Sequence, residues 1–185
     1  MSDSMRSYSF GQFTDNASEL RRLEAQADLG WREIDCRILA RTSPKPGQRV
    51  LDLGCGPGFI ARRLSDMVGK NGEVVGVDLN ESLLTIAHNR NASSQVRFAN
   101  ASVYDLTSYR GEFDFVYARL LFQHLEDPEK ALNQIWQTLA PGGVLIVVDI
   151  DDGVFTVLPE PPGFVEFTQE AAAHQQRQGG DVNAQ

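Results

Sequence analysis

The chain alternates between short apolar runs and longer stretches in which apolar residues recur every three or four positions. The short runs are rich in β-branched residues and are bounded by glycine, proline or asparagine, which is typical of buried strands. The longer stretches are typical of amphipathic helices. The predicted strands cover 50–53, 73–77, 96–99, 113–118 and 143–150, and the predicted helices cover 17–41, 58–68, 80–91 and 128–138.

This order of elements predicts an α/β fold. Strands that alternate with helices form a parallel sheet with right-handed crossovers, so we expect a doubly wound, mostly parallel sheet with helices on both faces. We divide the chain into an N-terminal arm and cap helix (1–42), the α/β domain (43–158) and a polar C-terminal tail (159–185). The cap helix should bury one apolar stripe, formed by Leu20, Leu23, Ala27, Trp31, Ile34 and Ile38.

Candidate chemistry begins at residues 50–58, which read VLDLGCGPG. This segment is an apolar strand that passes through Asp52 into Gly54, Gly56 and Gly58, directly before a predicted helix. A turn with so little side-chain bulk lets a ligand lie against bare backbone, where the helix N-terminus offers unpaired N–H groups. The segment predicts a binding site for a nucleoside-type cofactor.

The spacing of the glycines indicates which cofactor. The dinucleotide fingerprint G-x-G-x-x-G would need a glycine where Phe59 stands. Asp52 would repel a diphosphate, whereas its charge suits S-adenosylmethionine, which carries a sulfonium and an ammonium and no phosphate. Asp78 ends the next predicted strand, twenty positions beyond Gly58. A carboxylate at that point can accept hydrogen bonds from ribose hydroxyls.

At this stage the chain resembles the class I S-adenosylmethionine-dependent methyltransferases. Four segments carry the resemblance in order: VLDLGCGPG at 50–58, VVGVDLN at 74–80, VRFANASVYDL at 96–106, and the region 113–150. The resemblance implies a Rossmann-like methyltransferase fold. It also implies methyl transfer from S-adenosylmethionine to a small-molecule acceptor by direct displacement at the sulfonium methyl, with S-adenosylhomocysteine as product.

The resemblance further implies a set of cofactor-binding residues after successive strands. They are Asp52, Gly54, Cys55, Gly56, Gly58, Asp78, Leu79, Ser102, Val103 and Arg119. Many relatives have an aspartate where Ser102 stands, so this chain departs from the family at its expected adenine contact. Val103 is equally well explained by ordinary packing.

Two residues are candidates for the acceptor side of the site. His124 is the histidine near the expected crevice, although it can equally cap or brace the helix that follows. Tyr8, together with Phe10 and Phe13, lies in an N-terminal arm that can close over the site as a lid, or can be ordered by unrelated contacts. We assign no catalytic base, because displacement at an activated methyl needs one only when the nucleophile carries a proton.

The net charge and the cysteine content limit the partners and the cellular compartment that we expect. Seventeen basic and twenty-five acidic residues give a net charge of −8, which disfavours nucleic acid and anionic membranes as partners. Cys36 and Cys55 are too few for a disulfide framework or a metal site, so we expect reduced thiols, no metal and a cytoplasmic location. No apolar run approaches the ~18 residues of a membrane span.

The C-terminal region departs from the family. Full sheets of this class append an antiparallel pair after the fifth strand, whereas here the strand 143–150 is followed by DDGVFTVLPEPPGF and the polar tail. We expect the antiparallel strands to be missing or abbreviated, and the last strand to form an exposed edge that favours a homodimer. The alternative, which we favour because the polar tail ends without a packing element, is that the chain is a fragment of a longer protein.

This departure leaves two other functions open. One is a non-catalytic or truncated methyltransferase-like binding module. The other, a nicotinamide-dependent oxidoreductase, is disfavoured by the missing third glycine of its fingerprint and by Asp52.

Overall fold

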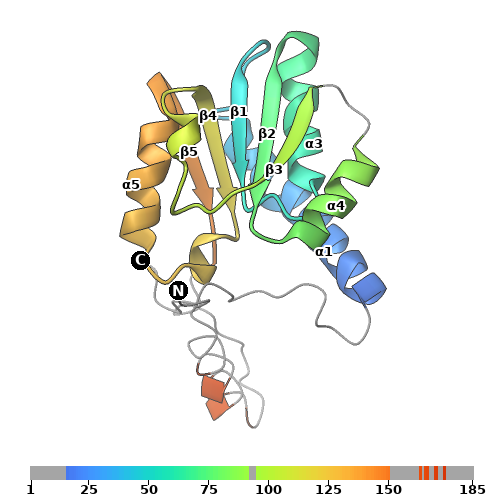
Figure 1. The fold of residues 1–185 in the computed structure, drawn as a ribbon. Helices are drawn as coiled ribbons and strands as arrows, with labels where there is room; N and C mark the ends of the chain where they lie inside the picture. Colours follow the sequence, from blue (N-terminus) through green and yellow to red (C-terminus); the bar gives the residue numbers. More distant parts are fainter. Residues whose placement is uncertain are drawn as a thin grey trace.

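A five-stranded parallel sheet forms the centre of the molecule, with the strand order β3-β2-β1-β4-β5 (Figure 1). The computed structural model describes residues 16–91 and 95–150, together with positions 163, 165, 166, 169, 170 and 173. The strands are β1 (Arg49–Leu53), β2 (Glu73–Asp78), β3 (Val96–Asn100), β4 (Phe113–Arg119) and β5 (Leu139–Val148). The predicted doubly wound parallel sheet is confirmed, and the described residues contain no antiparallel strand after β5.

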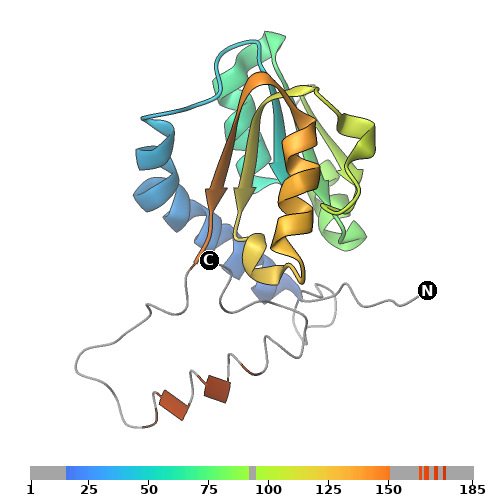
Figure 2. The same cartoon turned by 90° about the vertical axis from the view of Figure 1, so that its left-hand side faces the viewer.

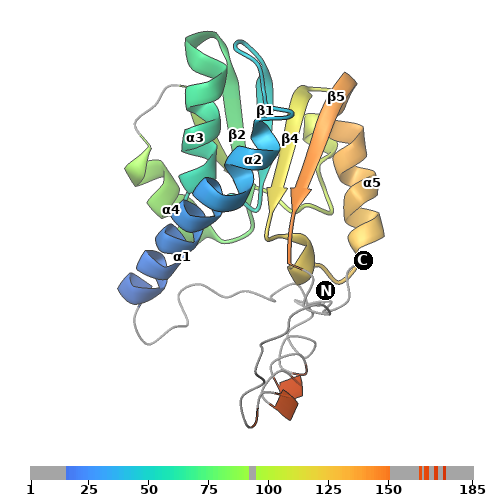
Figure 3. The ribbon, with the colours of Figure 1, turned by 180° about the vertical axis from the view of Figure 1, so that it is seen from behind.

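Helices cover both faces of the sheet. One face carries α3 (Phe59–Val68), α4 (Glu81–Arg90) and an N-terminal helical segment, as the view from behind shows (Figure 3). The opposite face carries α5 (Pro128–Thr138) and the short 3₁₀ turn η3 (Thr107–Tyr109), so the sheet lies between two helical layers (Figure 2). The remaining 3₁₀ turns are η2 (Gly69–Asn71) and η4 (Phe122–His124).

Strand alternation divides the apolar core into two clusters. Val50 faces the layer of α3 and α4, while its neighbour Leu51 faces the layer of α5. Both side chains are fully buried. Strands buried on both faces read as continuous apolar runs, which is why the sequence pattern located them well.

The N-terminal helical segment differs from the predicted continuous helix 17–41. It consists of α1 (Asn16–Gly30), a π-helical turn η1 (Trp31–Asp35) and a short α2 (Cys36–Leu39). The prediction that Ile34 belongs to the buried stripe is wrong, since Ile34 is 49% exposed and Asp35 is 0% exposed. A π turn takes up one more residue than an α turn, and this brings Asp35 rather than Ile34 onto the sheet.

The β5 strand starts four positions earlier than the predicted 143–150. Its pairing with β4 shifts between Phe113 and Phe115, and β5 continues through the Pro141–Gly143 turn. At this amino edge of the sheet, Asp114 Oδ2 accepts a hydrogen bond of 2.9 Å from the Arg49 N–H.

The outer edge of β5 and the outer face of α5 expose apolar side chains. Val147 on β5 is 42% exposed, and Leu132 and Trp136 on α5 are 43% and 69% exposed. The arm with Tyr8, Phe10 and Phe13 lies outside the described residues. No helix in the described part of the chain is long and apolar enough to cross a membrane.

Candidate functional site

The carboxyl ends of the strands share the lower edge of the sheet in Figure 1. The glycine segment 54–58 follows β1, Asp78 ends β2, Ser102 follows β3 and Arg119 ends β4. In open α/β sheets this is the edge at which ligands bind. The fold therefore brings the predicted segments together at one edge.

The glycine loop needs its glycines for backbone conformation. Gly54, Gly56 and Gly58 have φ angles of 66°, 51° and 80°, in the left-handed region that residues with a Cβ rarely adopt. The loop is held by hydrogen bonds from Cys55 N–H to Val77 O (3.0 Å) and from Gly58 N–H to Cys55 O (2.9 Å).

The three glycines differ in what a side chain would meet. A Cβ on Gly58 would lie 2.7 Å from Phe98 Cζ, and one on Gly54 would lie 3.1 Å from Leu121 Cδ1. A Cβ on Gly56 would have Leu83 Cδ1 as its nearest neighbour, at 3.9 Å. Gly58 therefore allows the start of α3 to pack, whereas a side chain on Gly56 would make only ordinary van der Waals contact with Leu83.

Asp78 ties the glycine loop to the end of β2. Its Oδ2 accepts a hydrogen bond from the Gly56 N–H and its Oδ1 accepts one from the Asn80 N–H, both 2.8 Å long. Asn80 in turn caps α4 by accepting a hydrogen bond of 3.1 Å from the Leu83 N–H. Burial raises the pKa of Asp78, and the backbone N–H donors oppose this rise by stabilising the carboxylate.

Asp52 is the buried carboxyl group beneath the loop. Its side chain is 2% exposed, and its Oδ2 has no hydrogen-bond partner among the described residues. Burial and the nearby charge of Asp78 raise the pKa of Asp52 to about 8, against the opposing effects of the Ala61 N–H and of Arg119. A buried acceptor without a donor is rare in proteins and indicates a missing partner.

A second buried carboxyl group, Asp35, holds Arg119. Asp35 Oδ1 accepts a hydrogen bond from the Tyr117 hydroxyl, and Asp35 Oδ2 accepts one of 3.1 Å from Arg119 Nε. Arg119 Nη2 also donates to Gln26 O at 3.3 Å. The guanidinium therefore lies against the N-terminal helical segment, where any side chain on Gly30 would collide with it at 1.8 Å.

The other predicted cofactor residues are less specialised. The Cys55 side chain is buried against Gly76 and Phe98, and burial raises the pKa of its thiol. Leu79 is 49% exposed at the edge, and Val103 is buried in the core at 7% exposure. Ser102 Oγ accepts a hydrogen bond of 3.2 Å from the Tyr104 N–H.

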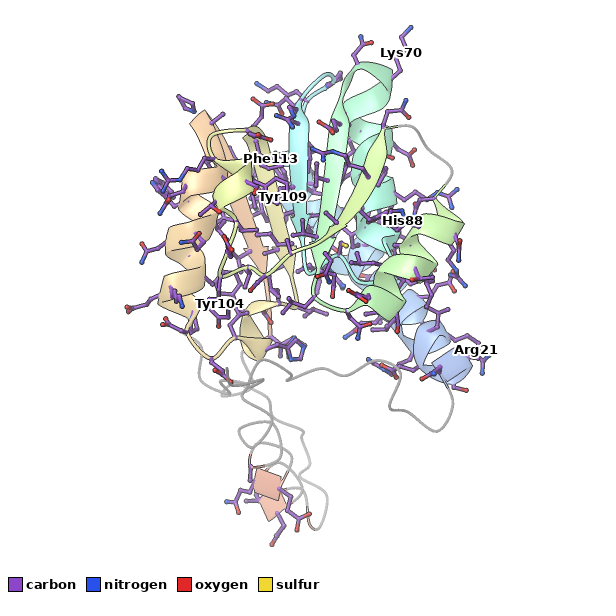
Figure 4. The ribbon with its side chains drawn as sticks, viewed as in Figure 1. Arg21, Lys70, His88, Tyr104, Tyr109 and Phe113 are labelled. Carbon is purple, nitrogen blue, oxygen red and sulfur yellow. The ribbon has the colours of Figure 1, made fainter. Side chains whose placement is uncertain are left out.

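Tyr104 links the Ser102 turn to the start of α5. Its hydroxyl accepts a hydrogen bond of 3.0 Å from the Asp127 N–H, and its ring lies under Lys130 Nζ at 5.4 Å (Figure 4). These contacts place the Ser102–Val103 turn against the same layer as α5.

His124 lies in η4, on the loop that follows β4. Burial lowers the pKa of its imidazole, and the charge of Asp149 opposes this effect. Tyr8, the other predicted acceptor-side residue, is outside the described residues.

Sequence reasoning missed Asp35, Tyr117 and Asp149. Asp149 had a positional signal, because it directly follows β5 at the carboxyl edge. Asp35 and Tyr117 had none, since the inward position of Asp35 depends on the π turn. The described residues contain no group of three or more His, Cys, Asp or Glu side chains that could hold a metal.

The arrangement suits a cationic ligand with a nucleoside part. Asp78 accepts a hydrogen bond from the Gly56 N–H of the glycine loop, and the buried carboxyl group of Asp52, just before the loop, has an oxygen without a donor among the described residues. A Cβ on Gly56 would make only ordinary contact with Leu83. The residues therefore fit the cofactor that the sequence predicts, by charge and by the orphaned oxygen of Asp52.

Comparison with known families and sequences gives consistent results. A family model described as a methyltransferase domain matches residues 44–182. The ubiquinone/menaquinone biosynthesis C-methyltransferase UbiE of Vibrio vulnificus is 33% identical over 129 residues, which cover 68% of this chain and 48% of that protein. The demethylmenaquinone methyltransferase of Thermus thermophilus is 35% identical over 144 residues, or 77% of this chain and 60% of that protein. The chain thus spans about half the length of the first of these relatives and somewhat more of the second.

Solved structures agree on the fold. A methyltransferase from Aquifex aeolicus aligns with a TM-score of 0.65 at 23% identity, covering 88% of this chain and 87% of that one. A phosphoethanolamine N-methyltransferase 2 of Haemonchus contortus, in complex with phosphomonomethylethanolamine and S-adenosylhomocysteine, aligns with a TM-score of 0.65 at 28% identity. That alignment covers 80% of this chain and 33% of the Haemonchus protein.

Proposed function

The chain belongs to the class I S-adenosylmethionine-dependent methyltransferase family, and on that premise we propose that it transfers a methyl group from S-adenosylmethionine to a small-molecule acceptor. The observation that carries this proposal is Asp52. Its buried Oδ2 lacks a donor among the described residues, and Asp52 lies in β1, two residues before the glycine loop at 54–58. A ligand that carries positive charge and hydrogen-bond donors satisfies that oxygen, whereas a diphosphate does not.

Each part of the cofactor has a candidate partner. We assign the ribose hydroxyls to Asp78, whose carboxylate is already oriented by the Gly56 and Asn80 N–H groups. We assign the amino-acid end to Asp52 and the glycine loop, and the adenine to the turn at Ser102 and Val103. Leu79 and Arg119 complete the proposed cofactor-binding set, as the sequence predicts.

Methyl transfer depends more on the alignment of the acceptor with the methyl group than on reactive side chains. S-adenosylmethionine supplies an electrophilic methyl group on a positively charged sulfur. The protein binds the cofactor at the carboxyl edge and holds the acceptor close to that methyl group, so that proximity and orientation lower the barrier. His124 and Tyr8 remain our proposed acceptor-side residues, and no catalytic base is assigned.

The acceptor class is supported by the relatives and by charge. The two sequence relatives are named as a ubiquinone/menaquinone biosynthesis C-methyltransferase and a demethylmenaquinone methyltransferase, and the Haemonchus protein as a phosphoethanolamine N-methyltransferase. A C-methylated and an N-methylated small molecule are therefore the first acceptors to test. We propose that nucleic acid is not the acceptor, because a net charge of −8 opposes binding to a polyanion. We propose the cytoplasm as the compartment, in keeping with the free thiols of Cys36 and Cys55.

We retain the domain division at residues 1–42, 43–158 and 159–185 as a proposal. The family match begins at residue 44, which supports the first boundary, but it extends to residue 182, beyond the second. We also propose a homodimer that pairs through the exposed edge of β5. The exposure of Val147 and Trp136 supports it, and sedimentation equilibrium tests it.

Calorimetric titration tests the proposed function. We expect S-adenosylmethionine and S-adenosylhomocysteine to bind and NAD not to bind. Asp78→Ala should weaken S-adenosylhomocysteine binding by about 1–3 kcal/mol, the range for charge-assisted hydrogen bonds. The control is Asp66→Ala, which removes an exposed carboxylate from α3 and should leave affinity unchanged.

The outcomes separate the alternatives. Binding of NAD alone would support an oxidoreductase. Binding of S-adenosylmethionine without transfer to demethylmenaquinone, phosphoethanolamine or a broader acceptor panel would support a non-catalytic binding module. Equal affinity of Asp78→Ala and wild type would exclude the ribose assignment.

A further inference from the structure

The turn after β4 has an unusual backbone. Leu120 has a φ angle of 54°, and it is the only residue other than glycine with a positive φ in the described part of the chain. A leucine rarely adopts this conformation, because its Cβ crowds the neighbouring carbonyl oxygen. Strained residues of this kind persist when surrounding contacts hold them, and they gather at functional sites.

The end of β5 supplies the contacts that hold this turn. The Leu120 N–H donates a hydrogen bond of 2.7 Å to Val148 O. Asp149 Oδ2 accepts hydrogen bonds from the Phe122 N–H at 2.7 Å and the Gln123 N–H at 3.4 Å. Asp149 Oδ1 accepts a further hydrogen bond of 2.9 Å from the Ile150 N–H, which fixes the carboxylate itself.

The turn places the Leu121 side chain against the glycine loop. Leu121 lies against Gly54, with its Cδ1 3.1 Å from the position of a Cβ on that glycine. The His124 N–H donates to Leu121 O at 3.0 Å, so the imidazole is carried by the same hydrogen-bonded unit. The next residue, Leu125, is buried and anchors the far end of η4.

Asp149 also acts on His124 through its charge. Burial lowers the pKa of His124, and the negative charge of Asp149 opposes that effect. Among the described residues, Asp149 is the charged group whose field acts on this imidazole. The same carboxylate thus fixes the backbone of the turn and stabilises the protonated imidazole.

We propose that Asp149 is a positioning residue, which holds the turn after β4 so that His124 lies beside the bound cofactor on the acceptor side. This inference rests on the proposed function. It differs from a purely structural role for Asp149, because a structural brace would contribute to stability without determining how His124 responds to ligand.

NMR spectroscopy of the full chain with ¹⁵N-labelled histidine tests the inference. Imidazole signals of His124, assigned by His124→Gln, are followed during a pH titration and during addition of S-adenosylhomocysteine. The variants are Asp149→Ala, which removes the acceptor and the charge, and Asp149→Asn, which keeps an oxygen that can accept the N–H bonds. The matched control is Asp114→Asn, which alters a carboxylate that accepts the Arg49 N–H at the opposite edge of the sheet.

We expect S-adenosylhomocysteine to shift the His124 signals of the wild type and of Asp114→Asn. In Asp149→Ala this shift should fall at least threefold, while calorimetric affinity for S-adenosylhomocysteine stays within about threefold of wild type. In Asp149→Asn the response should persist, and the pKa of His124 should fall because the charge of Asp149 is lost.

Three results would overturn the inference while the proposed function stands. The first is a wild-type His124 that does not respond to bound S-adenosylhomocysteine. The second is a full response in Asp149→Ala, and the third is an unchanged His124 pKa in Asp149→Asn. Failure of the wild type to bind S-adenosylhomocysteine in calorimetry would instead reject the proposed function, and the inference with it.

Discussion

Asp52 should make the stability of the ligand-free protein fall as pH rises through the neutral range. Its pKa is raised from 3.8 to about 8, first by burial and then by the charge of Asp78. Between these values the folded state holds a proton on Asp52 that the unfolded state has released. Folding is therefore favoured at the lower end of the window and loses stability towards pH 8.

The magnitude follows from the size of the shift. One pKa unit corresponds to about 1.4 kcal/mol. Inside the window from pH 4 to pH 8, the free energy of unfolding should therefore fall by roughly 1.4 kcal/mol for each pH unit because of this one group. Between pH 5 and pH 7 the loss is roughly 2.8 kcal/mol, a large fraction of the stability of a small domain.

Urea unfolding at pH 5, 6 and 7 measures this loss, with Asp52→Asn as the variant. Asparagine has nearly the same shape and does not titrate, so the difference between the two proteins isolates Asp52 from the other carboxylates. We expect the wild type to lose stability relative to Asp52→Asn at each step, and the control Asp66→Asn to follow the wild type. Parallel curves for the wild type and Asp52→Asn would refute the reasoning.

The same proton should be released when the cofactor binds. With a pKa of about 8, roughly 0.9 of a proton occupies Asp52 at pH 7, by the ordinary titration relation. A cation placed beside the carboxyl group favours its ionised form. Calorimetry of S-adenosylmethionine binding in buffers of different ionisation enthalpy should therefore show proton release by the wild type and almost none by Asp52→Asn.

Other substitutions test the loop, the N-terminal segment and the sheet edge. Gly58→Ala and Gly47→Ala both place alanine at a positive φ, which costs about 1–2 kcal/mol. Only Gly58→Ala also brings a Cβ to 2.7 Å from Phe98 Cζ, so the Gly58→Ala protein should have the lower melting temperature of the two. Asp35→Ala should lower the free energy of urea unfolding by roughly 3–5 kcal/mol, because it removes the carboxylate that pairs with the largely buried guanidinium of Arg119. Glu33→Ala, at an exposed neighbouring position, should change it by less than about 0.5 kcal/mol. Val147→Lys should shift sedimentation equilibrium towards monomer, and an unchanged mass would reject pairing through β5.

The sequence predicted the sheet and the glycine loop because their signals are local. Doubly buried strands appear as apolar runs, and the glycines from Gly54 to Gly58 appear as missing side chains at fixed spacing. Asp78 was predictable for a similar reason, since its place at the end of β2 follows from strand length. Features that depend on chain geometry within a few residues are therefore accessible from sequence.

Features that depend on packing between distant segments were not accessible. The π turn that buries Asp35 is a small change in helical register, and the apolar stripe through Ile34 gave no sign of it. Arg119 was predicted from its place after β4, but the direction of its guanidinium depends on Asp35 and Gln26, more than eighty residues earlier in the chain. The cap that Asp149 forms on η4 likewise joins two loops that only the sheet brings together.

The hydrogen-bond partners of the three carboxyl groups also indicate which carboxyl group would pair with a bound cation. Asp35 is compensated by the Tyr117 hydroxyl and by Arg119, and Asp78 is compensated by backbone N–H groups. Asp52 has the Ala61 N–H and the more distant field of Arg119, and its Oδ2 has no donor within the described structure. With its raised pKa, Asp52 is therefore the carboxyl group that holds a proton in the ligand-free protein and can supply negative charge when a cation binds. A fold that needed only stability would be expected to place an apolar residue at this position, so the retained carboxyl group is best explained by a positively charged ligand.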